Sequence, residues 1–309
     1  MSRPSAIITA VFVLLLSHLP LVAQNRILAD IPIELARNKT IIPVTIGASS
    51  PLRLILDSGM HYDGILIFDR EKVDLNSFKH LVEVQLRGAG QGGATRALSD
   101  DAATFSIGPL RFEKQRVTIL ATEIYKGFPT DGVIGYSLLG HYAVEIDYDR
   151  SRMLLYEPTA FSPVAGWESI DLYFKDNRIP WTDIRVVTTK EEPAVVAAYI
   201  DFASGEAVEL LERETNAFTL PATRVERLAG RGLSGDIHGK DGRLANVCIG
   251  SFVLKDVAVL VVPATVRSRQ NGADAIIGSN TLRRFNLIFD YAHHKLHLRP
   301  NRYFAEPFP

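Results

Sequence analysis

The hydrophobic positions along the chain predict short β-strands rather than helices. Stretches of five to seven residues alternate apolar and polar side chains or are rich in β-branched residues, and clusters of Gly, Pro, Asn and Asp separate them. These stretches are 41–46, 52–56, 82–86, 116–120, 144–148, 183–187, 194–200, 257–262 and 287–291. Helical patterns are confined to 137–142, 280–285 and 207–215. The pattern therefore predicts a mainly β protein with few, short helices.

A tandem repeat divides the chain into two similar halves. Residues 131–155 align without a gap on 274–298, 143 positions further along, with seven identities. At nearly the same offset, the match extends to the pairs 107–110 with 249–252, 86–90 with 228–232 and 54–57 with 198–201. Such regularity indicates duplication of one β unit.

The repeat predicts an all-β, bilobal fold built from two β-barrel-like units. We expect an N-terminal lobe over 26–158 and a C-terminal lobe over 168–305, joined where Pro158, Pro163 and Gly166 interrupt the pattern. One short helix is expected after the Ile-Gly step of each unit.

Two aspartates occupy equivalent places in the two units. An apolar strand over 54–56 ends in Asp57-Ser58-Gly59, and a second strand over 195–200 ends in Asp201. A strand holds the backbone rigid, and the turn after it presents the carboxylate together with backbone N–H groups. If the units pack about a twofold axis, the two carboxylates approach each other and share a proton. One can then act as a base on water while the other protonates a carbonyl. The alternative for Asp57 is an ordinary turn aspartate.

These residues resemble the Asp-Thr/Ser-Gly signature of the pepsin and retropepsin aspartic peptidases, over about residues 30–300. Val133-Ile134-Gly135 and Ile276-Ile277-Gly278 resemble the apolar-apolar-Gly element that packs beneath the signature loop in each lobe. The resemblance is to bacterial, exported proteins with two such units in one chain. It implies a catalytic pair Asp57 and Asp201, and it implies substrate-binding flaps at the glycine-rich stretches containing Gly88, Gly90, Gly230 and Gly232.

The second lobe departs from this signature at two positions. Phe202 stands where the family has Thr or Ser, so it has no hydroxyl to bond to the opposite loop, whereas Ser58 keeps its half of that bridge. Ala203 stands where the family has Gly, and its β-carbon is expected to disturb the backbone N–H groups that face the carboxylates. Both changes support the alternative of a catalytically degenerate site.

Other patterns in the chain match motifs of dinucleotide-binding and metal-binding sites, but their sequence context argues against both. Both glycine-rich stretches satisfy Gly-x-Gly-x-x-Gly, but no helix follows either, so a dinucleotide site is not expected. His293, His294 and His297 lack a nearby acidic or cysteine ligand in sequence, which favours a solvated strand edge over a metal site. No metal and no organic cofactor is expected.

The N-terminal residues predict export. Arg3, an apolar run from Ala6 to Leu16 and small residues before Gln24 are typical of a signal peptide over 1–23, and an uncleaved anchor is the alternative. A secreted or periplasmic location follows, with membrane contact only through such an anchor. The single cysteine excludes an internal disulfide. The net charge of −1 gives no reason to expect nucleic acid as a partner.

The sequence thus predicts an exported endopeptidase-like hydrolase that acts on polypeptide as a monomer, because one chain supplies both aspartates. Two alternatives stay open. One is a catalytically degenerate protein that binds peptide or glycan on the same scaffold, and the other is a purely structural envelope module.

Overall fold

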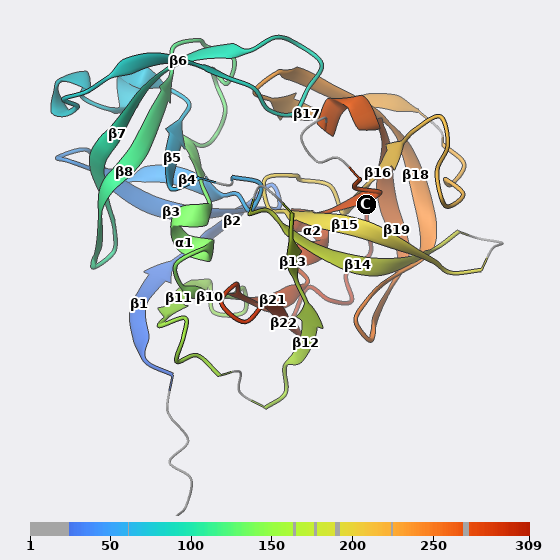
Figure 1. Ribbon diagram of the computed structural model, residues 1–309. Helices are drawn as coiled ribbons and strands as arrows, with labels where there is room; N and C mark the ends of the chain where they lie inside the picture. The colour runs from blue at the N-terminus through green and yellow to red at the C-terminus, as the bar shows by residue number, and fades with distance from the viewer. Residues whose placement is uncertain are drawn as a thin grey trace, which may run out of the picture.

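Each half of the repeat folds into a curved sheet, and a third sheet joins the halves (Figure 1). The structure, a computed structural model, describes residues 25–60, 62–162, 165–175, 178–188, 192–223, 225–267 and 272–309. The predicted all-β, bilobal fold is confirmed. The predicted signal peptide lies outside the described residues.

The N-terminal lobe is an eight-stranded sheet in the order β2-β3-β4-β9-β5-β8-β7-β6. Antiparallel pairing of β3 with β7 closes the strands between them into a barrel. The strands span Glu34–Ala36 (β2), Lys39–Ile46 (β3), Leu52–Leu56 (β4), Gly64–Ile67 (β5), Val82–Leu86 (β6), Thr95–Ile107 (β7), Leu110–Leu120 (β8) and Gly132–Ile134 (β9). Two 3-10 turns, η1 (Arg70–Lys72) and η2 (Leu75–Ser77), follow β5.

The C-terminal lobe repeats this topology, with the order β13-β14-β15-β20-β16-β19-β18-β17 and closure by β14 and β18. Its strands span Tyr173–Phe174 (β13), Pro180–Val187 (β14), Ala194–Asp201 (β15), Val208–Glu212 (β16), Glu226–Gly232 (β17), Gly235–Ile249 (β18), Phe252–Pro263 (β19) and Ala275–Gly278 (β20). A 3-10 turn, η3 (Ala264–Arg267), follows β19. The equivalent strand orders show the duplication in three dimensions.

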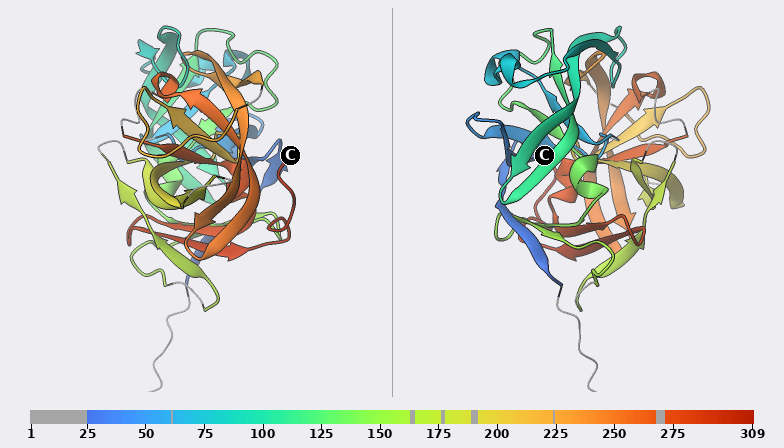
Figure 2. Two further views of the ribbon diagram at one scale, coloured as in Figure 1. Left: turned by 90° about the vertical axis from the view of Figure 1, so that its right-hand side faces the viewer. Right: turned by 60° about the vertical axis from the view of Figure 1, so that its left-hand side comes forward.

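A six-stranded antiparallel sheet connects the lobes below the barrels (Figures 1 and 2). Its order is β1-β11-β10-β21-β22-β12, so strands of the two repeats meet at the centre, where β10 pairs with β21. The strands span Ile27–Pro32 (β1), Ala143–Asp147 (β10), Arg152–Tyr156 (β11), Glu168–Asp171 (β12), Phe285–Asp290 (β21) and Lys295–Pro300 (β22).

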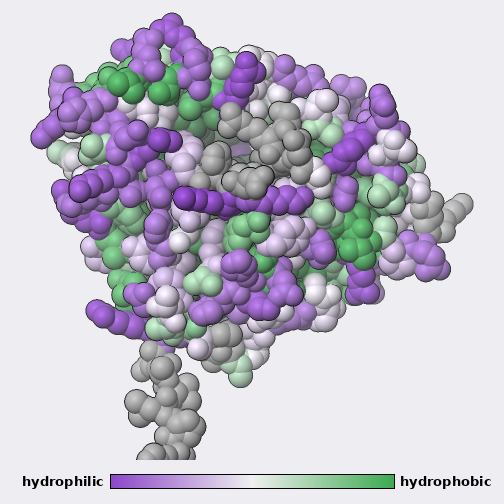
Figure 3. Space-filling model, viewed as in Figure 1, coloured by the Kyte–Doolittle hydropathy of each residue, from purple (hydrophilic) through white to green (hydrophobic). Residues whose placement is uncertain are grey.

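The core follows from the apolar pattern of the strands. Leu54 and Leu56 of β4, Ile200 of β15 and Leu287 of β21 are fully buried in one continuous cluster that runs through both barrels and the joining sheet. The strands that carry the two candidate aspartates are therefore anchored in the same core. On the surface, hydrophilic residues predominate on the face drawn in Figure 3.

The predicted short helices are present, slightly earlier than expected, as α1 (Tyr136–Leu139) and α2 (Ser279–Leu282). The helix predicted at 207–215 is wrong. That segment forms β16, which pairs in parallel with β19 and in antiparallel with β20. Its apolar residues are buried on both faces of the sheet, which gives a short continuous apolar run in the sequence. A buried helix can give the same run. Among the residues that the structure describes, no helix is both long and apolar enough to cross a bilayer.

Candidate active site

Asp57 stands at the end of β4, where that strand runs in parallel with β9. Its backbone N–H donates to Ile134 O (2.7 Å), and the N–H of Gly59 donates to its Oδ1 (2.8 Å). Met60 N donates to Asp57 O (3.1 Å) and closes the turn. The strand and the turn thus hold the carboxylate in one orientation.

Asp201 ends β15, which runs in parallel with β20 in the same way. The N–H groups of Ala203 and Ser204 donate to its Oδ1 (2.8 and 3.1 Å). Its side chain is buried. The expectation that Ala203 disturbs these N–H groups is therefore wrong, because the loop keeps them directed at the carboxylate despite the added β-carbon.

The two carboxylates converge beside Gly59. A β-carbon at Gly59 would lie 3.1 Å from Asp57 Oδ1 and 3.8 Å from Asp201 Cγ, so both carboxylates border the same small space. Burial, and then the negative charge of Asp201, raise the pKa of Asp57 to about 7. The structure thus brings together the two aspartates that the repeat singles out.

Ser58 joins the two loops across the interface between the lobes. Its hydroxyl donates to Ile200 O (2.7 Å) and accepts from Phe202 N (3.2 Å). Phe202 cannot return an equivalent bond, and its ring is instead fully buried, with its centroid 5.5 Å from that of Phe289. The Ser58 hydroxyl therefore makes both of these hydrogen bonds between the loops. The Phe202 ring packs against Phe289 instead of forming a hydrogen bond.

The Ile-Gly elements pack closely beneath both loops. A β-carbon at Gly135 would lie 2.0 Å from Asp57 O, and one at Gly278 would lie 2.3 Å from Glu206 O. Any larger residue would displace the loops that carry the aspartates, which explains why the repeat keeps glycine at both positions.

The two predicted flaps meet each other above the lobes (Figure 1). Gly88 and Gly90 lie in the β6–β7 loop, and Gly230 and Gly232 lie on β17, next to the β17–β18 turn. Gly88 N donates to Ser234 Oγ (3.2 Å), and Ser234 N donates to Ala89 O (2.9 Å). The loop from one lobe and the hairpin from the other are thus hydrogen-bonded into one strap.

Four polar residues beside the dyad were not predicted. They are Lys39, Ser204, Glu209 and Arg267. Lys39 Nζ donates to Ala203 O, and burial lowers its pKa although the nearby carboxylates oppose the change. Arg267 Nη1 lies 3.7 Å from Asp201 Oδ2, and its Nη2 lies 2.7 Å from Glu209 Oε1. The dyad therefore lies beside two cations, one from each lobe.

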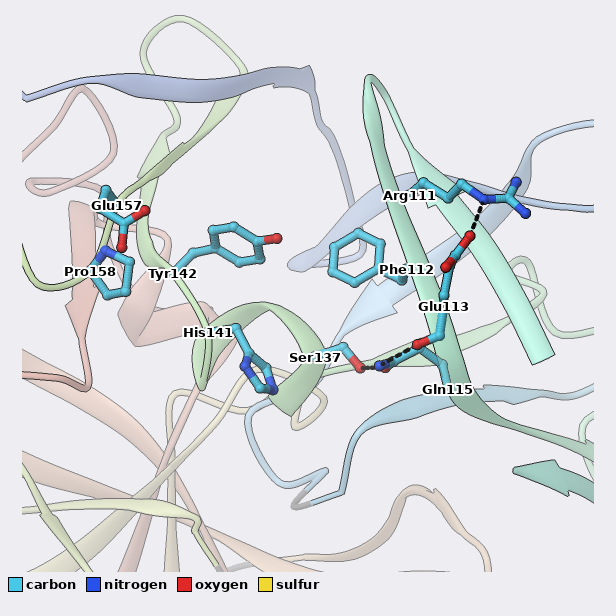
Figure 4. Close-up of a pocket in the computed structure, with 9 residues that line it drawn as sticks. All are labelled: Arg111, Phe112, Glu113, Gln115, Ser137, His141, Tyr142, Glu157 and Pro158. Atoms are coloured by element: carbon cyan, nitrogen blue, oxygen red, sulfur yellow. Dashed lines mark hydrogen bonds and ion pairs between the residues drawn. The ribbon is translucent and has the colours of Figure 1, made fainter. Parts of the chain in front are cut away.

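A separate hollow of about 380 Å³ lies between α1 and β8 (Figure 4). Ser137, one of its lining residues, accepts from Gly64 N (2.6 Å) and contacts Gln115 Oε1 (3.0 Å). The lining includes neither aspartate and no flap residue. We therefore do not place the chemistry in this hollow.

The histidines near the C-terminus do not form the solvated strand edge that the sequence suggested. His293 and His294 lie in the turn before β22, and His297 is buried. Asp290 contacts His293 Nδ1 (2.8 Å) and lies 3.6 Å from His297 Nε2. Within the described part of the chain, no group of three or more His, Cys, Asp or Glu residues could hold a metal ion.

A search of solved structures places this fold beside that of a known enzyme. The aspartic proteinase from Irpex lacteus matches with a TM-score of 0.54 and 11% sequence identity, over 90% of this chain and 98% of that chain. At this identity the match establishes the bilobal fold. No protein-family model and no curated protein sequence matches the chain.

Proposed function

We propose that the protein is an aspartic endopeptidase that hydrolyses peptide bonds with water activated between Asp57 and Asp201. The observation that carries this proposal is the convergence of the two carboxylates at Gly59, with the pKa of Asp57 raised to about 7. Close carboxylates that share a proton supply an acid and a base to the same substrate bond. The strap of flaps would hold an extended polypeptide over this pair.

The reaction needs no group beyond the two carboxylates and water. The ionised member takes a proton from water as the water oxygen bonds to the carbonyl carbon, and the protonated member gives its proton to the carbonyl oxygen. The C–N bond then breaks, the amine nitrogen takes a proton from the first carboxyl, and the second carboxylate takes one from the hydroxyl. The products are an acid and an amine, and the dyad is restored.

The proposal extends to export and to a monomeric enzyme. The apolar segment before residue 24 supports secretion or a periplasmic location. Both aspartates come from one chain, which supports a complete site in a monomer. A protein that binds peptide or glycan without cleaving it is the competing function, and binding that survives Asp57→Asn without any cleavage by the wild type would favour it.

A cleavage assay tests the proposed function. Residues 24–309 are incubated with a diverse peptide library from acid to neutral pH, beside Asp57→Asn and Asp201→Asn. We expect each substitution to lower cleavage by ~10²–10⁴-fold, because it removes one partner of the acid–base pair. Asp171→Asn, which changes an exposed carboxylate on β12, is the control and should cleave like the wild type. Absence of cleavage by the wild type at every pH would contradict the proposal.

A further inference from the structure

The twofold symmetry of the repeat is broken beside the dyad. Glu209 pairs with Ile276 of β20 as Leu66 pairs with Val133 of β9, so a buried carboxylate replaces a buried leucine. Arg267 lies four residues after the end of β19 and Tyr125 lies five residues after the end of β8, so the two occupy nearly the same sequence position in the two repeats. The N-terminal lobe keeps Leu66 and Tyr125 in an apolar cluster. The C-terminal lobe has an ion pair at the corresponding positions.

This ion pair is built around Asp201. Arg267 Nη2 contacts both carboxylate oxygens of Glu209 (2.7 and 2.9 Å), and Nη1 lies 3.7 Å from Asp201 Oδ2. Ser204 Oγ donates to Glu209 Oε1 (2.6 Å), while Ser204 N donates to Asp201 Oδ1 (3.1 Å). The Arg267 and Glu209 side chains are 10% and 3% exposed, so water screens this pair weakly.

The surroundings of the two aspartates therefore differ in charge. Asp201 accepts two backbone N–H groups and lies beside a guanidinium, which stays protonated at every working pH. Within the described residues, Asp57 accepts one backbone N–H group, from Gly59. Hydrogen bonds and an adjacent cation both favour the ionised form of a carboxyl. The shared proton is thus driven away from Asp201.

We propose that Arg267, positioned by Glu209 and Ser204, fixes the negative charge on Asp201 and so makes Asp201 the base and Asp57 the acid. The two roles rest on the proposed hydrolysis, whereas the assignment of charge does not. In the reaction, Asp201 takes the proton of the attacking water and Asp57 gives its proton to the carbonyl oxygen. When the C–N bond breaks, Asp201 protonates the nitrogen and Asp57 recovers a proton from the hydroxyl. Arg267 is a positioning residue and exchanges no proton.

The other charged and titratable groups near the dyad do not reverse this assignment. Lys39 lies beside the Ala203 carbonyl, so its positive charge acts on both carboxylates. In the part of the chain that the structure describes, the remaining groups are tyrosines, which stay neutral because burial raises each pKa, and carboxylates that already have partners. They are Tyr62, Tyr125, Tyr199, Tyr291, Glu206 and Glu209.

A titration of the wild-type protein tests the charge assignment without any substrate. The side-chain carboxyl carbons of aspartate are labelled with ¹³C, and the signals of Asp57 and Asp201 are identified from their loss in Asp57→Asn and Asp201→Asn. We expect the Asp57 signal to titrate with a midpoint near 7 and to show that Asp57 carries the proton of the pair below that pH. A proton found on Asp201 in this range, or shared equally, would overturn the proposal.

Two variants with opposite expected effects separate a positioning role from a merely structural one. Arg267→Gln removes the cation, so the titration of Asp57 should move to higher pH by ~1 unit or more. Glu209→Gln removes an anion but keeps an oxygen that can accept from Arg267 and hold it in place, so the titration should move to lower pH. Arg267→Lys keeps the charge and should restore most of the wild-type midpoint. Equal shifts in Arg267→Gln and Arg267→Lys would overturn the role of the charge.

The two proposals fail in different ways. If the wild type cleaves no peptide but carries the shared proton on Asp57, the proposed function is wrong and the charge assignment stands. If the wild type cleaves peptide but carries the proton on Asp201, the proposed function stands and the charge assignment is wrong. If Arg267→Gln does not fold, the wild-type titration still decides the charge assignment.

Discussion

Protonation of Asp57 sets the pH range that we expect for activity. Burial and the charge of Asp201 raise its pKa from 3.8 to about 7, and the reaction needs one proton on the dyad. The ratio kcat/KM on a fluorogenic peptide should therefore fall as pH rises through about 7. The contribution of this carboxyl to folding stability should also decline between those two pKa values, because the folded state binds its proton more tightly. A profile that stays flat to pH 9 would disagree with this role.

Ser58 bridges the two loops through its hydroxyl, and no other described residue of these loops does so. Ser58→Ala leaves the buried Ile200 carbonyl and the buried Phe202 N–H without their partner. We expect a loss of ~1–3 kcal/mol in the free energy of unfolding, measured by denaturant titration, together with a lower kcat. Ser58→Thr keeps the hydroxyl and should lose much less. Equal stability of the Ala and Thr variants would show that the bridge contributes nothing.

The strap of flaps is the element that we expect to control access to the dyad. Gly90 has φ +113°, and a β-carbon there would lie 2.6 Å from Gly235 O. Gly90→Ala should therefore strain the closed strap by ~1–3 kcal/mol. We expect faster hydrogen exchange at Ser234 and a fall in kcat/KM of about tenfold or more.

Gly93→Ala is the matched control in the same loop, since no atom lies within 4 Å of a β-carbon there and its φ is outside the left-handed region. If both alanine variants behave alike, the contact between the flaps does not limit access.

The strands and the paired loops could be predicted from sequence because each depends on a local pattern that occurs twice. The strand within 207–215 could not be predicted from sequence, because its apolar residues fit a helix as well as a strand. Only the pairing of β16 with β19 and β20 makes it a strand. Glu209 in that segment gave a signal, because a charge replaces the apolar Leu66 of the first repeat. Lys39 gave no comparable signal, since only the packing of the lobes brings it to the loop that carries Asp201.

At the scale of the whole molecule, the joining sheet should make the lobes unfold together. Leu287 of β21 is fully buried and pairs with Ile146 of β10 at the centre of that sheet. Leu287→Ala should lower stability by ~2–5 kcal/mol. Hydrogen exchange should then accelerate equally in β4 and β15, one strand from each barrel.

The exposed Val253 of β19 provides a control, because Val253→Ala should change stability by less than ~0.5 kcal/mol. Loss of protection in the C-terminal barrel alone after Leu287→Ala would show that the lobes are independent domains.

The central claim is that Asp57 and Asp201 act as one catalytic unit, and a double-mutant cycle tests it most directly. The rate of peptide cleavage is measured for the wild type, Asp57→Asn, Asp201→Asn and the double variant at one pH below 7. Residues that act as a unit give non-additive losses. We predict that each single variant loses nearly as much activity as the double variant. Losses that multiply, or full activity in either single variant, would contradict a shared dyad.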